Sequence, residues 1–353
     1  MKIALLNLPI DNNYGGNLQR YALMKVLHDM GHDVIHLNLR FNYIIPWYKT
    51  PVYYGKRILK KILLQRNINI FDTPQKQYEQ NCSITESFYQ KYIEHTEEIA
   101  EPELLCKYTD YDAFVVGSDQ VWRKRIAGKY MPYLFFSHIQ NIEKPKIACA
   151  VSFGTDKNEL IEDEILYYGD LYKKFSAVSV REKSGLRLLE QLGWIAPKAI
   201  QLLDPTFMLT KSDYQEIIKA SETKAPKGDL VCYILDMTQE KDDVIKKISV
   251  KKKLTPYYVS LNDNVSIPQW LRLFNDAEFI ITDSFHGLVF SLIFNKPFRL
   301  IRNEFRGNAR FDSIIETFNL KHNQEIFNWE EINNVIAQYR NRFTNFLDTA
   351  LKS

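Results

Sequence analysis

The fold of this chain is decided by residues 278–297, which read EFIITDSFHGLVFSLIFNKP. The apolar run 279–282 has the length and the β-branched content of a buried strand. Ser284 is a favourable helix N-cap, and the apolar residues 287–294 that follow it predict a buried helix. A further strand is predicted at 298–302, so the stretch forms a strand–turn–helix–strand unit of a parallel sheet.

His286 stands at the N-terminus of the predicted helix, just past the carboxyl end of the strand. Open α/β sheets bind ligands at that edge, and helix N-termini favour anions. The alternative is a histidine that caps the helix or packs in the core. Its position in a polar turn, between Phe285 and Gly287, favours a functional role.

Length and composition limit the classes of protein to consider. With 353 residues, the chain is long for a single core and predicts two domains. Hydrophobic residues make up 45% and charged residues 25%, as in ordinary globular proteins. The net charge of +3 is too small to indicate nucleic acid, and we expect no such partner. The four cysteines form no CxxC pair and the seven histidines no HExxH or HxH pattern, so no metal site is expected.

The chain is expected to be cytoplasmic, because it begins directly in a strand and has no apolar run long enough to span a bilayer. An irregular insertion is predicted at 40–110, with one basic amphipathic helix at 54–64. That composition suits peripheral contact with a negatively charged inner membrane face. The simpler alternative is a solvated helix that packs its Ile/Leu face on the protein.

The opening residues predict a βαβ unit with strands at 2–8 and 33–39. Asn17 is expected to cap the helix that follows the polar turn 11–16. The turn is not a GxGxxG sequence, so a dinucleotide site is not predicted. Two interpretations remain open, a plain tight turn or a turn in which Asn17 and nearby backbone amides face a ligand.

Two later strands, predicted at 111–117 and 146–151, each end in a turn of small and polar residues. Such turns mark the ligand-binding edge of a parallel sheet. The residues expected to line the cleft there are Asp119, Gln120, Trp122 and Ser152.

Arg181 ends the predicted strand 176–180 and is followed by Glu182. An arginine in that position either binds a carboxylate or phosphate or forms half of a structural ion pair with Glu182. We favour the anion site. The arginine-rich loop 302–310 provides further cations on the same side.

The predicted fold class is α/β, with two Rossmann-like domains and the active site in the cleft between them. We divide the chain into 1–205 and 206–353 because a second series of strands and helices begins after Asp204-Pro205. The terminal helix 329–351 is expected to pack back on the first domain. No Walker A lysine, EF-hand loop or GxSxG elbow is present, which argues against ATP hydrolysis, calcium binding and hydrolase chemistry.

Six segments then point to a family. They read NYGGNLQRYAL (13–23), YDAFVVGSDQVWR (111–123), SVRE (179–182), LLDPTF (202–207), ITDSFHGLVFSLIFNKPF (281–298) and NARFDSII (308–315). Together they resemble the polysaccharide pyruvyl transferase family over nearly the whole chain, least clearly at 40–105. The resemblance implies a GT-B-like pair of Rossmann domains. It also implies transfer of pyruvate from phosphoenolpyruvate to two hydroxyls of one sugar, as a cyclic ketal, in the synthesis of a bacterial capsule, exopolysaccharide or cell-wall glycan.

The resemblance carries the family's histidine onto His286, as the general acid, and its strand-end arginine onto Arg181. Many members have a basic residue where this chain has Ser284, and Arg302 or Arg310 would compensate for its loss. The residues expected to bind the donor are Ser284, Gly287, Arg306 and Arg310. The implied partners are phosphoenolpyruvate, as donor substrate, and a sugar or lipid-linked oligosaccharide as acceptor, with no cofactor. Two alternatives stay open, a nucleotide-sugar glycosyltransferase of GT-B type and a catalytically inactive sugar-binding member of the fold.

Overall fold

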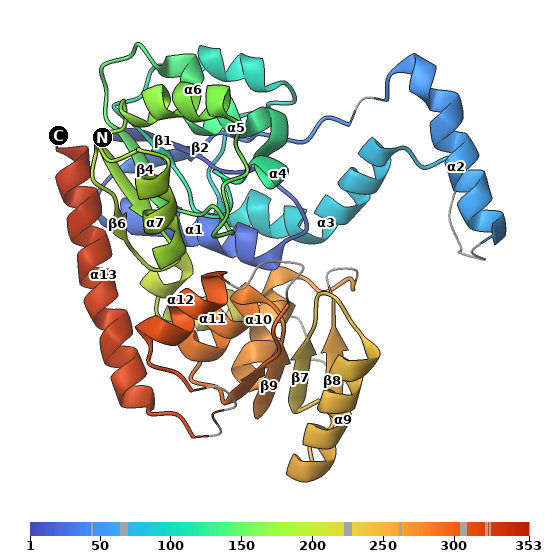
Figure 1. Cartoon of the computed structure of the whole chain (residues 1–353). Coiled ribbons are helices and arrows are strands. Elements are labelled where there is room, and N and C mark those ends of the chain that lie inside the picture. The colour runs from blue at the N-terminus through green and yellow to red at the C-terminus, as the bar shows by residue number, and fades with distance from the viewer. Residues whose placement is uncertain are drawn as a thin grey trace.

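The computed structural model describes residues 1–43, 45–63, 70–221, 228–260, 263–303, 309–321, 324 and 326–352. Two parallel sheets organise them (Figure 1). The first has the order β2-β1-β3-β4-β5-β6 and the second β10-β9-β7-β8. The predicted α/β class with two Rossmann-like sheets is confirmed.

The strands are short, and most are buried, although β8 and β10 at the edges of the second sheet are only partly so. They are β1 (Lys2–Leu6), β2 (Asp33–His36), β3 (Ala113–Val116), β4 (Lys146–Val151), β5 (Ala177–Val180), β6 (Ile200–Gln201), β7 (Leu230–Tyr233), β8 (Pro256–Val259), β9 (Phe279–Thr282) and β10 (Phe298–Leu300). Helices connect them. They are α1 (Tyr14–Asp29), α2 (Thr50–Leu63), α3 (Pro74–Tyr92), α4 (Lys124–Ala127), α5 (Met131–Leu134), α6 (Glu162–Tyr172), α7 (Lys183–Gln191), α8 (Lys211–Lys219), α9 (Gln239–Lys252), α10 (Ile267–Asp276), α11 (Phe285–Ile293), α12 (Ala309–Thr317) and α13 (Trp329–Leu351). Two 3₁₀ turns matter below, η1 (Trp47–Lys49) and η5 (Pro205–Met208).

Both sheets reverse their strand order at one point, between β1 and β3 in the first and between β7 and β9 in the second. Ligands bind at such switch points, outside the carboxyl ends of the strands. The helix that follows β1 is α1, and the helix that follows β9 is α11. The two switch points therefore direct attention to the N-termini of α1 and α11.

The predicted strand–turn–helix unit is confirmed. Strand β9 covers 279–282, and α11 begins at Phe285 with Ser284 as its N-cap. The helix is buried throughout, because seven of its nine residues are apolar or glycine, and the other two, His286 and Ser291, are also buried.

The prediction that Asn17 caps the first helix is wrong. Helix α1 begins four residues earlier, because the N-cap is Asn13, whose side chain accepts a hydrogen bond from the amide of Gly16. Asn17 is fully buried inside the helix instead. Its amide nitrogen donates to the carbonyls of Asp11 and Asn13, at 3.1 and 3.0 Å.

The domains share one hydrophobic core. Residues from α1, η5, α10, α11 and α13 belong to a single cluster of buried side chains. At its centre Tyr14 stacks on Trp270, with ring centroids 5.5 Å apart, so that α1 is packed directly onto the second domain. An apolar interface of this kind fixes the two switch points relative to each other.

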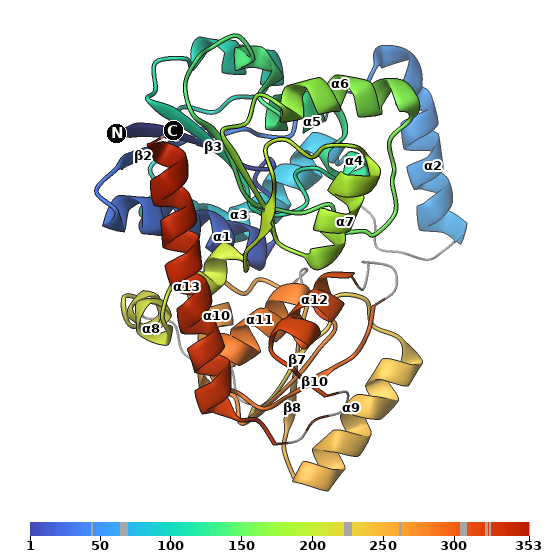
Figure 2. The same ribbon diagram turned by 60° about the vertical axis from the view of Figure 1, so that its left-hand side comes forward.

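Helix α13 runs along both domains and ends beside the N-terminus of the chain (Figures 1 and 2). The Tyr339 hydroxyl donates to Gln201 Oε1 at 2.9 Å, and Arg340 Nε donates to the Phe207 carbonyl at 2.8 Å. Phe343 and Leu347 are fully buried in the shared core. In the part of the chain that the structure describes, no helix is both long and apolar enough to cross a membrane.

Candidate active site

The N-termini of α1 and α11 meet face to face. A Cβ on Gly15 would lie 1.9 Å from Nδ1 of His286, so only glycine leaves room for the imidazole. The two residues belong to the switch points of different sheets. His286 is 5% exposed and lies at the contact between the domains.

The imidazole faces a buried carboxylate. Nε2 of His286 is 3.7 Å from Oδ2 of Asp204, which is fully buried after β6. The second oxygen of Asp204 accepts hydrogen bonds from the amide and hydroxyl of Thr206, at 3.0 and 2.7 Å. Burial alone would raise the pKa of Asp204, but contact with His286 and the charge of Arg181 hold it well below the ordinary value. Asp204 is thus an ionised acceptor next to His286.

Arg181 lies behind this pair in a buried network. Its Nη1 donates to Asp204 at 2.5 Å, and its Nη2 is 3.3 Å from Oδ1 of Asp119. Burial lowers the pKa of Arg181, but Asp204 and Asp119 outweigh it and leave the pKa raised. The guanidinium therefore neutralises two buried carboxylates, and ion pairing accounts for much of its hydrogen-bonding capacity.

Glu182, the ion-pair partner considered from the sequence, has a different main role. Its Oε1 accepts from the hydroxyl of Ser152 and from the amides of Phe153 and Gly154, at 2.9, 2.9 and 3.0 Å. Its other oxygen is 4.0 Å from Nε of Arg181. Ser152 is fully buried and so supports the turn rather than lining an open cleft.

Two guanidinium groups approach the ring of Phe285. The Arg181 carbon Cζ is 4.5 Å from the ring centroid, and that of Arg310 is 5.3 Å away. Arg310 comes from α12 in the second domain and is 7% exposed. Burial and the charge of Arg181 lower its pKa to about 10. One cation from each domain thus lies against the ring of Phe285, the residue before His286.

By itself, the buried cluster of arginines and carboxylates around His286 has too little positive charge to bind an anion. Arg181 and Arg310 face three carboxylates, from Asp119, Glu182 and Asp204. A highly charged anion would therefore need further cations from nearby. Arg306 was predicted to be one of them and lies outside the described residues.

A cavity of about 460 Å³ between the domains offers such cations. It opens beside α12, where Ala309 and Ser313 line it, and beside the first turn of α7. Its basic lining residues are Arg123, Arg125, Lys157, Lys183 and Arg187. Among the described residues no side chain caps α7, since the N-cap Glu182 turns toward the 152–154 loop. The cavity thus combines basic side chains with an uncapped helix N-terminus, which suits an anion.

The remaining predicted residues have different roles. Gln120 accepts a hydrogen bond from Arg123 Nη1 at 2.8 Å and packs against Gly154, so it supports two residues that line the cavity. Gly287 is needed for packing, because a Cβ there would lie 2.1 Å from Thr282 Oγ1. Ser284 is 4% exposed, and its hydroxyl accepts from the amide of Gly287 at 3.4 Å.

The prediction that Trp122 lines the cleft is wrong. The indole is 1% exposed and stacks on Phe135 at 4.6 Å between ring centroids. Its Nε1 donates to the Leu134 carbonyl at 3.4 Å. Burial of the large ring among other aromatic side chains of the first domain outweighs any exposure at the turn.

Gly15, Asp204 and Phe285 were not predicted as site residues. Gly15 and Asp204 lie in the motifs YGGNLQ and LLDPTF. Gly15 belongs to the turn predicted after the first strand, and Asp204 follows β6. Their positions after strands could have marked them as site residues. Their partners are far away in the sequence, so the contacts themselves could not be derived.

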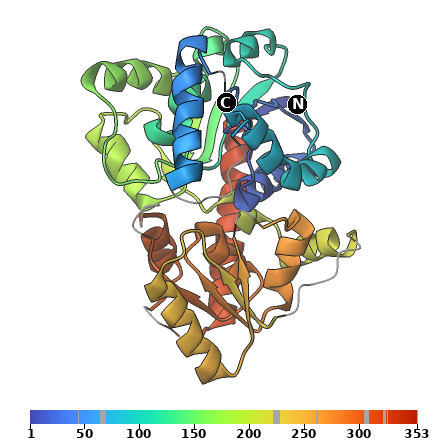
Figure 3. The ribbon, with the colours of Figure 1, turned by 90° about the vertical axis from the view of Figure 1, so that its right-hand side faces the viewer.

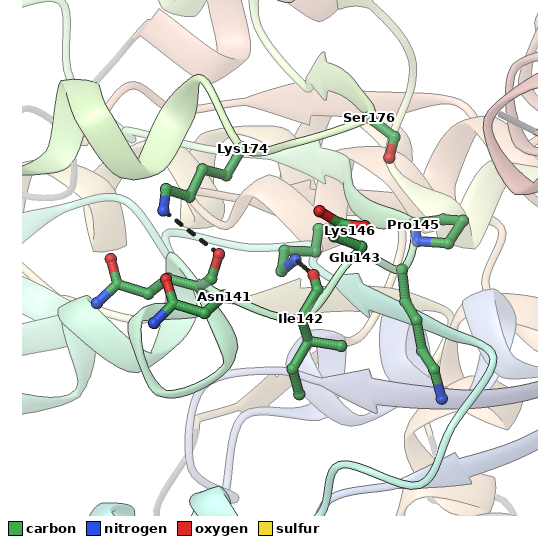
Figure 4. Close-up of a pocket in the computed structure, with 9 residues that line it drawn as sticks. Asn141, Ile142, Glu143, Pro145, Lys146, Lys174 and Ser176 are labelled. Carbon is green, nitrogen blue, oxygen red and sulfur yellow. Dashed lines mark hydrogen bonds between the residues drawn. The ribbon is translucent and has the colours of Figure 1, made fainter.

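Another cavity lies at the opposite, amino-terminal edge of the first sheet (Figure 4). It is lined by the residues that precede β4 and β5, with Lys146 and Lys174 pointing into the region. Both ammonium groups donate to backbone carbonyls, of Ile142 and Gln140. Its separation from both switch points excludes it from the candidate site. Over the described ranges, no cluster of three or more His, Cys, Asp or Glu side chains could hold a metal ion.

The fold and site define a two-domain α/β protein with a buried His–Asp–Arg cluster where its two switch points meet. Residues 13–304 match the family polysaccharide pyruvyl transferase, and the chain belongs to this family of transferases.

Solved structures of low sequence identity are also similar in fold. The UDP-GlcNAc 2-epimerase of Methanocaldococcus jannaschii is 12% identical, with a TM-score of 0.48 and coverage of 96% of this chain and 92% of the other. The UDP-GlcNAc 2-epimerase of Neisseria meningitidis is 10% identical, with a TM-score of 0.48 and full coverage of both chains. The spinosyn forosaminyltransferase SpnP is 11% identical, with a TM-score of 0.40 and coverage of 100% and 94%. The comparison with curated proteins finds no match.

Proposed function

We propose that this protein transfers pyruvate from phosphoenolpyruvate to two hydroxyls of one sugar, forming a cyclic ketal. Family membership supports a role in polysaccharide pyruvylation. The observation that carries the proposal is the meeting of His286 with Asp204 and with the two guanidinium groups beside Phe285. A proton donor and anion-binding groups are the two parts that this chemistry needs.

The reaction balances with one proton donor that is regenerated. A sugar hydroxyl adds to the C2 carbon of the donor, and the methylene carbon takes up a proton and becomes a methyl group; the proton of the hydroxyl restores the donor. The second hydroxyl then forms a bond to C2 as the bond from C2 to the phosphate oxygen breaks, and its proton leaves with the phosphate. His286 is proposed to deliver the proton to the methylene carbon. Asp204, ionised 3.7 Å from Nε2, would orient the ring as a positioning residue.

Donor binding is proposed to use cations from both domains. Arg310 from α12 supplies one, with Arg306 as a second, and Arg181 is proposed to contact the donor through the face that its carboxylate partners leave open. The basic cavity next to α12 would accept the phosphate or the carboxylate. The buried cluster contains more carboxylates than guanidinium groups, and a trianionic donor needs more positive charge than that. This supports a donor site that uses the cations of the cavity as well as those of the cluster.

The acceptor is proposed to be a sugar of a bacterial capsule, exopolysaccharide or cell-wall glycan, carried on a lipid-linked oligosaccharide. The enzyme would meet such an acceptor in the cytoplasm, at the inner face of the membrane. Phosphoenolpyruvate is proposed as the donor, without a cofactor. No nucleic-acid partner is proposed.

Incubation with phosphoenolpyruvate and lipid-linked or cell-surface glycans tests the proposal, with release of inorganic phosphate and gain of a ketal on the glycan as readouts. We expect His286→Gln to lower the single-turnover rate by about 10²–10⁴ at saturating donor, the usual effect of losing a general acid. His32→Gln, at the far edge of the first sheet, is the control. An unchanged chemical step in His286→Gln would refute the acid role. Transfer that depends on a nucleotide sugar, or glycan binding without turnover, would refute the proposed reaction.

A further inference from the structure

Among the described residues, exposed apolar side chains gather on a projecting arm, residues 47–63, made of η1 and α2. Figure 1 shows α2 at the side of the first domain, standing away from the first sheet with α3 between them, and Figure 3 faces this side, with α2 in front of the domain. Trp47 is 86% exposed, and Leu63 is 72% exposed. The other exposed apolar residues of the arm are Tyr48, Val52, Ile58, Leu59 and Ile62. The hypothesis of a solvated helix that packs its Ile/Leu face on the protein does not fit these exposures.

The helix is attached by its other face. The Tyr53 hydroxyl donates to the carbonyl of Asp72 at 3.1 Å, just before α3. Arg57 donates to the same hydroxyl at 2.9 Å, with its guanidinium 5.5 Å from the Tyr53 ring centroid. These contacts hold one side of α2 and turn Val52, Leu59 and Leu63, which recur at helical spacing, away from the protein.

The charge of the arm has one sign. Between residues 47 and 63 the sequence has no aspartate or glutamate, and its cations are Lys49, Lys56, Arg57, Lys60 and Lys61. On a helical projection Lys56 and Lys61 lie on either side of the exposed apolar stripe. Long basic side chains that flank an apolar face can extend their charges toward lipid headgroups while their stems stay on the apolar surface.

We propose that the arm is a membrane-contact element that lies in the plane of an anionic bilayer. Leu59, Ile62 and Leu63 would enter the boundary between headgroups and acyl chains, with Trp47 and Tyr48 at the level of the headgroups. Lysines of the arm would pair with anionic headgroups. The inference goes beyond the proposed reaction and does not depend on it, since lipid binding requires neither donor nor acceptor.

Other occupants of this face fit less well. A second copy of the chain would bring two arms of the same charge together, with no acidic residue in either arm to offset the repulsion. A protein partner would need an acidic apolar groove. The aromatic pair at the start of the arm, followed by an amphipathic basic helix, is typical of elements that bind the membrane interface.

Tryptophan fluorescence tests the proposal with the full chain. Of the five tryptophans, Trp47 is the one that is almost fully exposed, and Trp122, Trp194 and Trp270 are buried. Vesicles of phosphatidylcholine with phosphatidylglycerol should shift the emission to the blue, and vesicles of phosphatidylcholine alone should shift it far less. In Trp47→Phe the shift should disappear while co-sedimentation with the anionic vesicles remains.

Two sets of substitutions separate the apolar and the charged contributions. Leu59→Ser, Ile62→Ser and Leu63→Ser together should abolish co-sedimentation. Neutralising Lys49, Lys56 and Lys61 with glutamine should weaken binding to anionic vesicles by about a hundredfold. The matched controls, Val250→Ser and the set Lys198→Gln, Lys219→Gln and Lys247→Gln, change exposed residues elsewhere and should bind like the parent. Circular dichroism checks that each variant is folded.

Three results would overturn the inference. They are equal binding to neutral and anionic vesicles, unchanged co-sedimentation in the triple serine variant, and a stable dimer that the same three serines dissociate. The last result would assign the apolar face to a second copy of the chain.

Discussion

The imidazole of His286 occupies the space that a side chain on Gly15 would fill. A Cβ on Gly15 would lie 1.9 Å from Nδ1 and 2.0 Å from Cγ of His286. Because Gly15 belongs to the first domain and His286 to the second, the position of the histidine depends on the packing of α1 against α11. The glycine at this position is therefore part of what fixes the proposed proton donor.

Gly15→Ala should displace His286 while leaving the fold intact, because α1 gains helix propensity from the change. We expect a fall in kcat of about 10²–10⁴, comparable to loss of the general acid itself. Gly16→Ala is the matched control, since a Cβ there finds its nearest neighbours 3.5 Å away, on Asn13. Steady-state kinetics and thermal melts of both variants provide the comparison. Equal activity in the two would show that the imidazole can move without cost.

Arg181 is expected to matter for stability as well as for the donor. Arg181→Met removes the partner of two buried carboxylates, Asp204 and Asp119, and should destabilise the fold by about 3–5 kcal/mol. Arg187→Met, on the exposed side of α7, should change stability by less than about 0.5 kcal/mol. Urea unfolding measures both. Arg181→Lys keeps the charge but loses the planar fork, so we expect a raised apparent KM for phosphoenolpyruvate. A normal donor KM in this variant would move donor binding away from Arg181.

Local sequence signals were sufficient for much of the fold. The β-branched run before Ser284 and the apolar run after it specify β9 and α11, because strand length, capping and burial all agree there. The amphipathic pattern that starts at Trp329 specifies α13 with the same boundaries as the structure. Signals of this kind act over a few residues, so a single sequence reveals them.

The site depends on contacts between distant parts of the chain, and the sequence shows these poorly. The pairing of Asp204 with His286, and the fit of Gly15 against it, both arise only when the two sheets are brought together. Trp122 was placed at the cleft because it follows a strand end, but aromatic packing with Phe135 decided its position. A residue that follows a strand can be placed at the edge of the sheet. Its side-chain direction cannot be predicted in the same way, because the alternation of a strand ends where the turn begins.

His138 should make stability depend on pH. Burial lowers its pKa from 6.5 to about 4, and neither ring nitrogen has a hydrogen-bond partner among the described residues. Between pH 6.5 and 4 the unfolded chain therefore binds a proton that the folded chain does not, and stability falls as the pH falls. The total loss is about 3 kcal/mol at roughly 1.4 kcal/mol per unit of pKa.

The check is Tm against pH for the parent and for His138→Phe, which cannot be protonated. Above pH 6.5 the difference in Tm should be constant. Below it, the parent should lose stability faster than the variant, and carboxylates that titrate in both proteins cancel in the difference. Parallel curves down to pH 4 would contradict the prediction.

The last prediction concerns the basic cavity between the domains. Arg125, Lys157 and Arg187 line it, and their side chains have no hydrogen-bond or ion-pair partner within the described part of the chain. If the cavity accepts the phosphate or carboxylate of the donor, replacing all three with glutamine should raise the donor KM by about tenfold and spare kcat. Salt should weaken donor binding in the parent more than in the variant, because fewer charges remain to be screened.

The matched control uses the cavity at the opposite edge of the sheet, with Lys144→Gln and Lys174→Gln. Both sets remove positive charge from the first domain, so a general effect of net charge would appear in both. If donor KM rises only in the variant of Arg125, Lys157 and Arg187, the positive charges that bind the donor lie in the cavity beside α7 and α12. If acceptor KM rises and donor KM does not, the cavity binds an anionic group of the acceptor instead. If neither changes, the cations that bind the donor belong to the loop around Arg306 rather than to the cavity.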